Sequence, residues 1–164
     1  MMTPSLAEPS SPAARKLVVV ADDSPECRLA LRYATRRAQR TGGRLSLLYV
    51  MDPVNGQQWM AVEARMREEA REEAERVLYA LACEIERLGG SMPELIIREG
   101  LLREEVVRFV HEEPEIRLLV LGARVHRDGP GPLVANLAAD GALAYPVPVT
   151  IVPASLSSEA IDAF

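Results

Sequence analysis

Five short apolar runs along the chain predict buried β-strands at residues 16–21, 45–50, 95–97, 118–121 and 147–152. Between them, apolar residues at helical spacing predict helices over about 25–41, 60–88, 101–111 and a short segment that ends near Tyr145. Strands that alternate with helix-length connections form parallel sheets with helices on both faces. The pattern therefore predicts one α/β domain over residues 16–153, a five-stranded parallel, doubly wound sheet.

The two ends of the chain lack this periodicity. Residues 1–15 hold Pro4, Pro9 and Pro12 among serines and alanines, so we expect a flexible tail there. Residues 154–164 are polar, and we expect a loosely held C-terminal tail. Within the long helix, the charged stretch 65–76 predicts a solvated face crossed by ion pairs.

Composition and charge narrow the class of protein. The 164 residues are 48% hydrophobic and 26% charged, the balance of an ordinary globular domain. A net charge of −5 and an aromatic content of only 4% argue against nucleic-acid binding. No apolar run approaches the roughly 20 residues of a membrane span, and residues 1–15 do not resemble a secretory signal. Cys27 and Cys83 lie far apart, which favours a reduced, cytoplasmic protein.

Two loops are candidate ligand sites, because open parallel sheets bind ligands beyond the carboxyl ends of the strands where the winding reverses. They are residues 21–25, after the first strand, and residues 122–132, after the fourth. The pair Asp22 and Asp23 first suggests the acidic pocket of a phosphoacceptor receiver domain. That chemistry also needs an aspartate after the third strand and a lysine after the fifth, and neither is present. We therefore reject the receiver interpretation.

Four segments in register resemble the universal stress protein family. They are residues 16–38, with Asp-x-Ser after the first strand, 45–53, 118–122, and 146–153, which reads Pro-x-Pro-Val-x-Ile-Val-Pro. The resemblance covers about residues 16–153. It implies a Rossmann-like five-stranded parallel sheet, an adenine-nucleotide cleft between the two strands that flank the reversal, and homodimers. Some members of the family bind ATP tightly and others do not.

ATP-binding members of that family carry a Gly-x2-Gly-x9-Gly-Ser/Thr loop after the fourth strand, whose glycines let backbone N–H groups approach phosphate. Here Gly122 is present, but Val125, Ala135 and Asn136 stand at the other motif positions. We expect Val125, as a β-branched residue, to disfavour positive φ and to fill space where phosphate would lie. Asn136 replaces the hydroxyl with an amide that is still able to cap a helix.

Positive charge in the same loop has two interpretations. Arg124, His126 and Arg127 would bind phosphate in place of the missing glycines, since arginine pairs with phosphate in two-pronged fashion. Alternatively they form a solvated basic loop on an acidic protein.

Two residues match other parts of the family's cleft. Asp22 matches an aspartate near the ribose and any bound metal, or it serves the N-terminus of the next helix. Val50 matches a position near the adenine and would equally be a core residue. Asp23 stands where many relatives have glycine, and its charge counts against tight phosphate binding.

Catalytic chemistry is sparse in this sequence. His111 and His126 have no partner spacing for a metal, and Cys27 and Cys83 fall on helix faces as core residues. There is no Walker loop, no Gly-x-Ser-x-Gly elbow, and no Ser-Gly-Gly-x-Asp-Ser loop after the first strand. We therefore expect no catalytic residue, no resident metal and no enzymatic activity.

The sequence leads to three functional hypotheses. The first is a regulatory or protective homodimer with weak or absent binding of ATP or AMP, with or without Mg²⁺. The second is an ATP- or AMP-dependent switch or slow ATPase that uses the loop 122–136, and the third is an interaction module that has lost the cleft. In all three we expect an unidentified protein partner and neither nucleic acid nor membrane. The homodimer is expected to form through the last strand, by residues Val147, Val149, Thr150, Ile151 and Val152.

Overall fold

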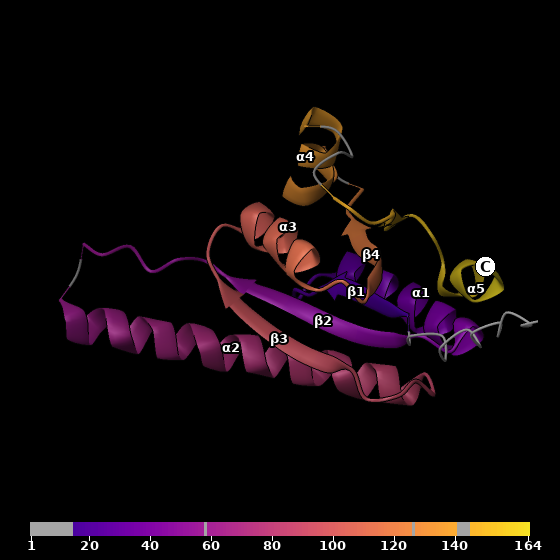
Figure 1. Ribbon diagram of the computed structural model, residues 1–164, viewed down its shortest axis with the longest axis horizontal. Helices are drawn as coiled ribbons and strands as arrows, with labels where there is room; N and C mark the ends of the chain where they lie inside the picture. The colour runs from indigo at the N-terminus through magenta and orange to yellow at the C-terminus, as the bar shows by residue number, and fades with distance from the viewer. Residues whose placement is uncertain (1–14, 58, 126, 141–144) are drawn as a thin grey trace, which may run out of the picture.

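The structure, a computed structural model, describes residues 15–57, 59–125, 127–140 and 145–164. Its strands are β1 (Lys16–Val20), β2 (Arg44–Met51), β3 (Glu94–Glu99), β4 (Ile116–Ala123) and β5 (Val149–Pro153). Its helices are α1 (Pro25–Thr41), α2 (Met60–Arg87), α3 (Leu102–Glu112), α4 (Pro132–Asp140) and α5 (Ser158–Ala163). The strands form one parallel sheet in the order β3-β2-β1-β4-β5, which confirms the predicted fold class (Figure 1).

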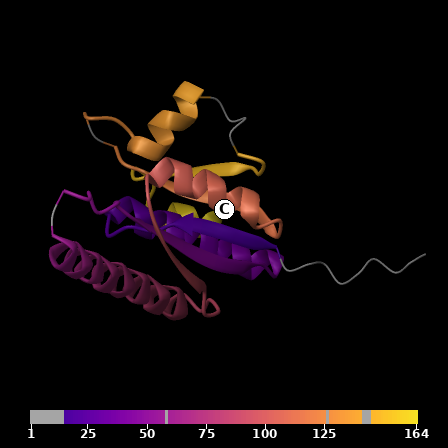
Figure 2. The same cartoon turned by 60° about the vertical axis from the view of Figure 1, so that its left-hand side comes forward.

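Helices lie on both faces of the sheet (Figure 2). Alternating side chains of the strands build a separate apolar core on each face. Leu17 and Val19 of β1 pack with α1, α2 and α5, whereas Val18 packs with α3 and α4. Both cores hold side chains that are completely buried, among them Leu31 on the first face and Leu119 on the second. The central strands β1 and β4 read as continuous apolar runs because helices cover them on both sides.

Helix α2 is buried only in its second half. Its buried residues begin at Ala74 and continue through Val77, Leu78 and Leu81. The first half carries the predicted ion pairs, including Arg65–Glu69 at 3.1 Å and Arg71–Glu75 at 3.3 Å. Met66, an apolar residue within this half, is 43% exposed. None of the described helices is both long and apolar enough to cross a membrane.

The C-terminal residues differ from the prediction. Residues 154–164 were expected to be a loosely held tail, but they contain α5, which packs against α1. Ile161 is completely buried. The carboxylate of Asp162 accepts hydrogen bonds from Arg32 Nε and Arg36 Nε, both at 2.9 Å, and these guanidinium groups hold the pKa of Asp162 well below its usual range. A six-residue segment is too short to show its helical period, so the prediction failed there.

Two other predictions fall wholly or partly on residues that the structure does not describe. The expected flexible tail lies there except for Arg15. The predicted short helix before Tyr145 is observed as α4, and residues 141–144 lie outside the described part. The expected domain limits 16–153 remain a prediction.

Candidate functional site

A cleft opens at the carboxyl ends of β1 and β4, where the winding of the sheet reverses. Its volume is about 150 Å³. The lining comes from the ends of β1, β2 and β4, the first turns of α1, α3 and α4, and the loop before α4. The lining residues are Val20, Ala21, Asp22, Ser24, Glu26, Cys27, Tyr49, Val50, Leu102, Leu121, Gly122, Arg124, Pro130, Gly131, Pro132, Leu133 and Val134.

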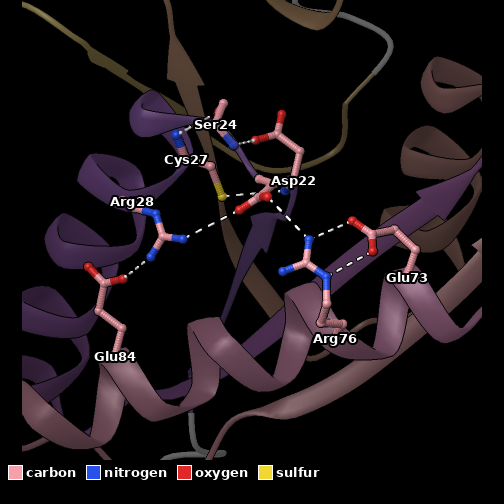
Figure 3. A network of polar contacts seen from close by, with 8 residues as sticks. Asp22, Ser24, Cys27, Arg28, Glu73, Arg76 and Glu84 are labelled. Carbon is pink, nitrogen blue, oxygen red and sulfur yellow. Dashed lines mark hydrogen bonds and ion pairs between the residues drawn. The ribbon is translucent and has the colours of Figure 1, made fainter.

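The loop after β1 is held by local hydrogen bonds (Figure 3). Asp22 Oδ1 accepts from the backbone N of Ser24 at 2.9 Å, and Ser24 Oγ caps α1 by accepting from the backbone N of Cys27 at 3.1 Å. The Cys27 thiol lies within 3.7 Å of Val20 O, to which it donates, and it accepts from the N of Asp22 at 3.5 Å. Burial raises the pKa of this thiol to about 12. Cys27 is therefore a neutral core group, as the sequence predicted.

Asp23 does not face the cleft. Its carboxylate accepts hydrogen bonds from Arg28 of α1 at 3.4 Å and from Arg76 of α2 at 3.3 Å. Arg28 also donates to Glu84, and Arg76 donates to Glu73 and thereby lowers the pKa of Glu73. Figure 3 shows Arg28 extending from α1 toward Glu84 of α2, and Arg76 extending from α2 toward the loop after β1. The charge of Asp23 thus joins the first loop to α2, and the expected repulsion of phosphate by Asp23 is weaker than the sequence suggested.

Gly122 has a structural reason to be glycine. A Cβ at this position would lie 2.5 Å from Glu26 O and 3.0 Å from Cys27 N. The first turn of α1 therefore rests directly on the end of β4, and only glycine allows this approach. The one glycine of the phosphate-loop pattern that survives in this chain is explained by packing alone.

Arg124 and Glu26 meet across the cleft. Arg124 Nε lies 3.6 Å from Glu26 Oε1. The Arg124 side chain is 52% exposed and that of Glu26 only 17%. The guanidinium group lies over Gly131, because a Cβ there would be 3.8 Å from Arg124 Nε. The charged end of the cleft is thus already occupied by an internal ion pair.

The other predicted residues of the loop do not line the cleft. Val125 is 68% exposed, Arg127 and Ala135 are exposed, and Asn136 is half-buried. No described residue other than glycine has positive φ, so the expected strain at Val125 is absent, and its side chain does not fill the cleft. His126 lies outside the described residues. The motif spacing survives, but it places Val125 and Ala135 on the exposed surface.

The apolar end of the cleft combines predicted and unpredicted residues. Val50 lines it and also packs against the core on the α3 side of the sheet. Tyr49 and Leu102 line it as well. Burial, helped by the nearby carboxylates, raises the pKa of Tyr49 above its ordinary value, so this phenol stays neutral.

The sequence did not identify three residues as part of the cleft, namely Glu26, Tyr49 and Leu102. Each stands within one or two residues of a strand or helix end that the pattern had located, which is the only sequence signal they carry. Among the described residues no cluster of three or more histidine, cysteine, aspartate or glutamate side chains is arranged to hold a metal ion.

A parallel sheet with a cleft where its winding reverses defines the broad class of doubly wound α/β proteins. The model of the universal stress protein family matches residues 13–153, so this chain belongs to the universal stress protein family. The resemblance seen in the sequence is thereby confirmed. No curated protein sequence gives a significant match.

Solved structures agree with this assignment. The universal stress protein UspA from Lactobacillus plantarum is 25% identical with a TM-score of 0.67, over 84% of this chain and 96% of that one. The universal stress protein from Archaeoglobus fulgidus in complex with dAMP is 21% identical, with a TM-score of 0.58 over 84% and 96%. A family protein from Arabidopsis thaliana with AMP bound is 17% identical, with a TM-score of 0.59 over 84% and 90%. The last two show a shared fold.

Proposed function

We propose that this protein is a non-enzymatic regulatory or protective universal stress protein that acts as a homodimer and binds adenine nucleotides weakly or not at all. The observation that carries the proposal is the state of the cleft. Its volume of about 150 Å³ is smaller than the roughly 300–1,000 Å³ of typical ligand pockets. The arginine that would attract phosphate is paired with Glu26 instead.

Isothermal titration of ATP with Mg²⁺ into the purified protein tests this proposal. We expect millimolar affinity or no heat of binding, and submicromolar affinity would contradict it. Any Mg²⁺ would arrive mainly on the phosphates, since this ion commonly binds through substrate phosphate and few carboxylates. The mass spectrum of the denatured protein's supernatant adds an independent check, because a tight site would carry adenine nucleotide through purification.

A triple variant separates two explanations of weak binding. Val125→Gly, Ala135→Gly and Asn136→Ser restores the family's loop residues. If the loop sequence limits affinity, the triple variant binds at least about tenfold more tightly, because each recovered charge-assisted bond contributes about 1.5–3 kcal/mol. These three side chains do not line the cleft, and Ala135 N already donates a hydrogen bond to Gly131 O. We therefore expect the triple variant to bind ATP with nearly the same affinity as the wild type.

The homodimer part of the proposal rests on the free edge of β5. Leu119 N donates to Pro148 O and Ala154 N to Ala123 O, so even-numbered residues of this strand bond to β4. In a parallel pair the intervening residues point their main-chain groups the other way, which leaves Val149 and Ile151 at the open edge. In an antiparallel pair of copies, Val149 would exchange hydrogen bonds with Ile151 of the second copy, about a two-fold axis at Thr150.

A variant at each edge of the sheet tests this dimer. Ile151→Lys places a charge on a side chain that is 42% exposed, and Leu95→Lys is its matched control on β3 at the opposite edge, 39% exposed. Light scattering at micromolar concentration is expected to give a dimer for the wild type and Leu95→Lys, and a monomer for Ile151→Lys. A monomeric wild type would rule the dimer out. Val147 precedes β5 and would contribute only packing.

The second candidate is an ATP- or AMP-dependent switch or slow ATPase that uses the loop 122–136. It is favoured by Arg124 at the cleft beside the start of α4, and by the AMP and dAMP held by the two relatives described above. The test measures the rate at which the protein releases phosphate from ATP. A rate above that of a control variant with Glu26 and Arg124 substituted would support this second candidate. We place the protein in the cytoplasm, where its two free cysteines would stay reduced.

A further inference from the structure

One end of the cleft is built to attract an anion. Helix α4 begins there at Pro132, and Leu133 and Val134 both line the cleft. The first N–H groups of a helix have no partner within it and carry partial positive charge. Arg124 adds a full positive charge beside Gly131, one residue before α4. A helix start and a guanidinium group together make a favourable place for a negative group.

Glu26 supplies that negative group from within the chain. Its side chain lines the cleft, is only 17% exposed, and lies 3.6 Å from Arg124 Nε. The backbone of Glu26 is held in place, because its carbonyl oxygen rests against Gly122 and its helix is capped by Ser24. Its carboxylate is also favoured by the start of α1, where it stands in the first turn. The Glu26 carboxylate is therefore favourably placed beside Arg124.

We propose that Glu26 is a specificity-determining residue that keeps a 5′-phosphate out of the cleft, so that the cleft takes an uncharged nucleoside in preference to its phosphorylated form. A phosphate at this end would compete with Glu26 for Arg124 and would lie beside the negative charge of the Glu26 carboxylate. A nucleoside places only its base and sugar in the cleft. The apolar end, with Val50, Tyr49 and Leu102, suits a base, and Asp22, which is exposed, also lines the cleft. This inference rests on the proposed function for the choice of adenine compounds.

The test compares two probes, adenosine and AMP, by ligand-observed NMR titration, which measures dissociation constants into the millimolar range. The quantity of interest is the ratio of the AMP constant to the adenosine constant. We expect this ratio to exceed one in the wild type. Glu26→Gln, which keeps the shape and removes the charge, is expected to lower the ratio about tenfold, since Arg124 becomes free for a charge-assisted bond to phosphate.

Three further variants make the result specific. Arg124→Gln alone is expected to raise the ratio, because it removes the positive charge and leaves Glu26 in place, and its exposed site makes misfolding a small risk. In the double variant Glu26→Gln, Arg124→Gln, the ratio is expected not to fall as it does in Glu26→Gln alone. Glu72→Gln, the same chemical change on the exposed part of α2, is expected to leave the ratio unchanged.

Two results would overturn the inference. One is an unchanged ratio in Glu26→Gln, and the other is the absence of binding by both probes to both the wild type and Glu26→Gln. Neither contradicts the proposed function, which predicts weak or absent nucleotide binding and is judged by the absolute affinity of the wild type for ATP. Conversely, tight binding of ATP by the wild type would end the proposed function, and the ratio would still decide the role of Glu26.

Discussion

The two sides of the cleft are made in different ways. On the β1 side, the side chains of Asp22 and Ser24 accept hydrogen bonds from backbone N–H groups. Asp23 accepts hydrogen bonds from arginines of both α1 and α2. On the β4 side, Arg124 is half-exposed and Val125 is mostly exposed. The first side is a fixed wall with its polar groups committed, and the second is a rim of solvent-exposed side chains.

This difference teaches where ligand preference is decided. The groups of the wall already satisfy one another, so a ligand gains little from them without breaking a native contact. When side chains of the rim change partners, the protein loses less stability, because water screens and replaces their contacts. The pair Glu26–Arg124 joins the two sides, one residue from each. The chemistry accepted by the cleft therefore depends on this pair more than on the loop's glycine pattern.

The largest expected effect is the protection of Cys27, which belongs to the wall. Burial raises the pKa of the Cys27 thiol to about 12, so this thiol is protonated at pH 8, and the side chain is only 2% exposed. We expect iodoacetamide at pH 8 to modify half-buried Cys83 in the folded protein and to reach Cys27 about 100-fold more slowly or not at all. Peptide mass mapping gives both rates. Equal rates would mean that the wall opens readily, and modification of both thiols in denaturant is the control.

The second effect compares glycines from the two sides. Gly122→Ala drives a Cβ into the backbone of α1, and we expect a loss of about 3 kcal/mol in the free energy of unfolding. Gly129→Ala, in the rim, meets nothing within 4 Å but has φ +95°, so we expect a loss of about 1 kcal/mol from backbone strain. Urea titrations measure both. The comparison fails if Gly122→Ala is no worse than Gly129→Ala.

The same contrast explains what the sequence predicted. The wall follows from local rules: the strand ending at Val20, the cap Ser24 and the proline at the first helical position all lie within six residues. Likewise, the order of strands and helices follows from apolar periodicity. The wall, the sheet and the location of the cleft could be predicted because each depends on neighbours in the chain and on general rules for parallel sheets.

The rim could not be predicted, because it depends on contacts between distant residues. The spacing from Gly122 to Asn136 matches the family pattern, yet Val125 and Ala135 lie outside the cleft. Glu26 carries no motif, and its role depends on Arg124, which lies 98 positions further along the chain. Helix α5 was missed for a similar reason, since its attachment depends on Arg32 and Arg36 in α1.

The third effect is the loss of the helix cap in the wall. Ser24→Ala removes the acceptor for Cys27 N at the start of α1, and we expect a loss of about 1 kcal/mol in the free energy of unfolding. Ser91→Ala, in the exposed connection before β3, is the matched control and is expected to change stability by less than about 0.5 kcal/mol. Thermal unfolding followed by circular dichroism checks both. Equal effects would show that the Ser24 cap does not stabilise the wall.

The smallest effect is expected at the rim. Arg124→Ala removes a side chain that is 52% exposed and one ion pair of 3.6 Å, and such pairs contribute about 0–1 kcal/mol. We expect a change in the free energy of unfolding of less than about 0.5 kcal/mol, since Glu26 keeps the favourable start of α1. The urea midpoint at low and high salt measures it, and a near-zero salt dependence of the difference is expected. A loss as large as that of Ser24→Ala would place Arg124 in the wall and remove the distinction between the two sides.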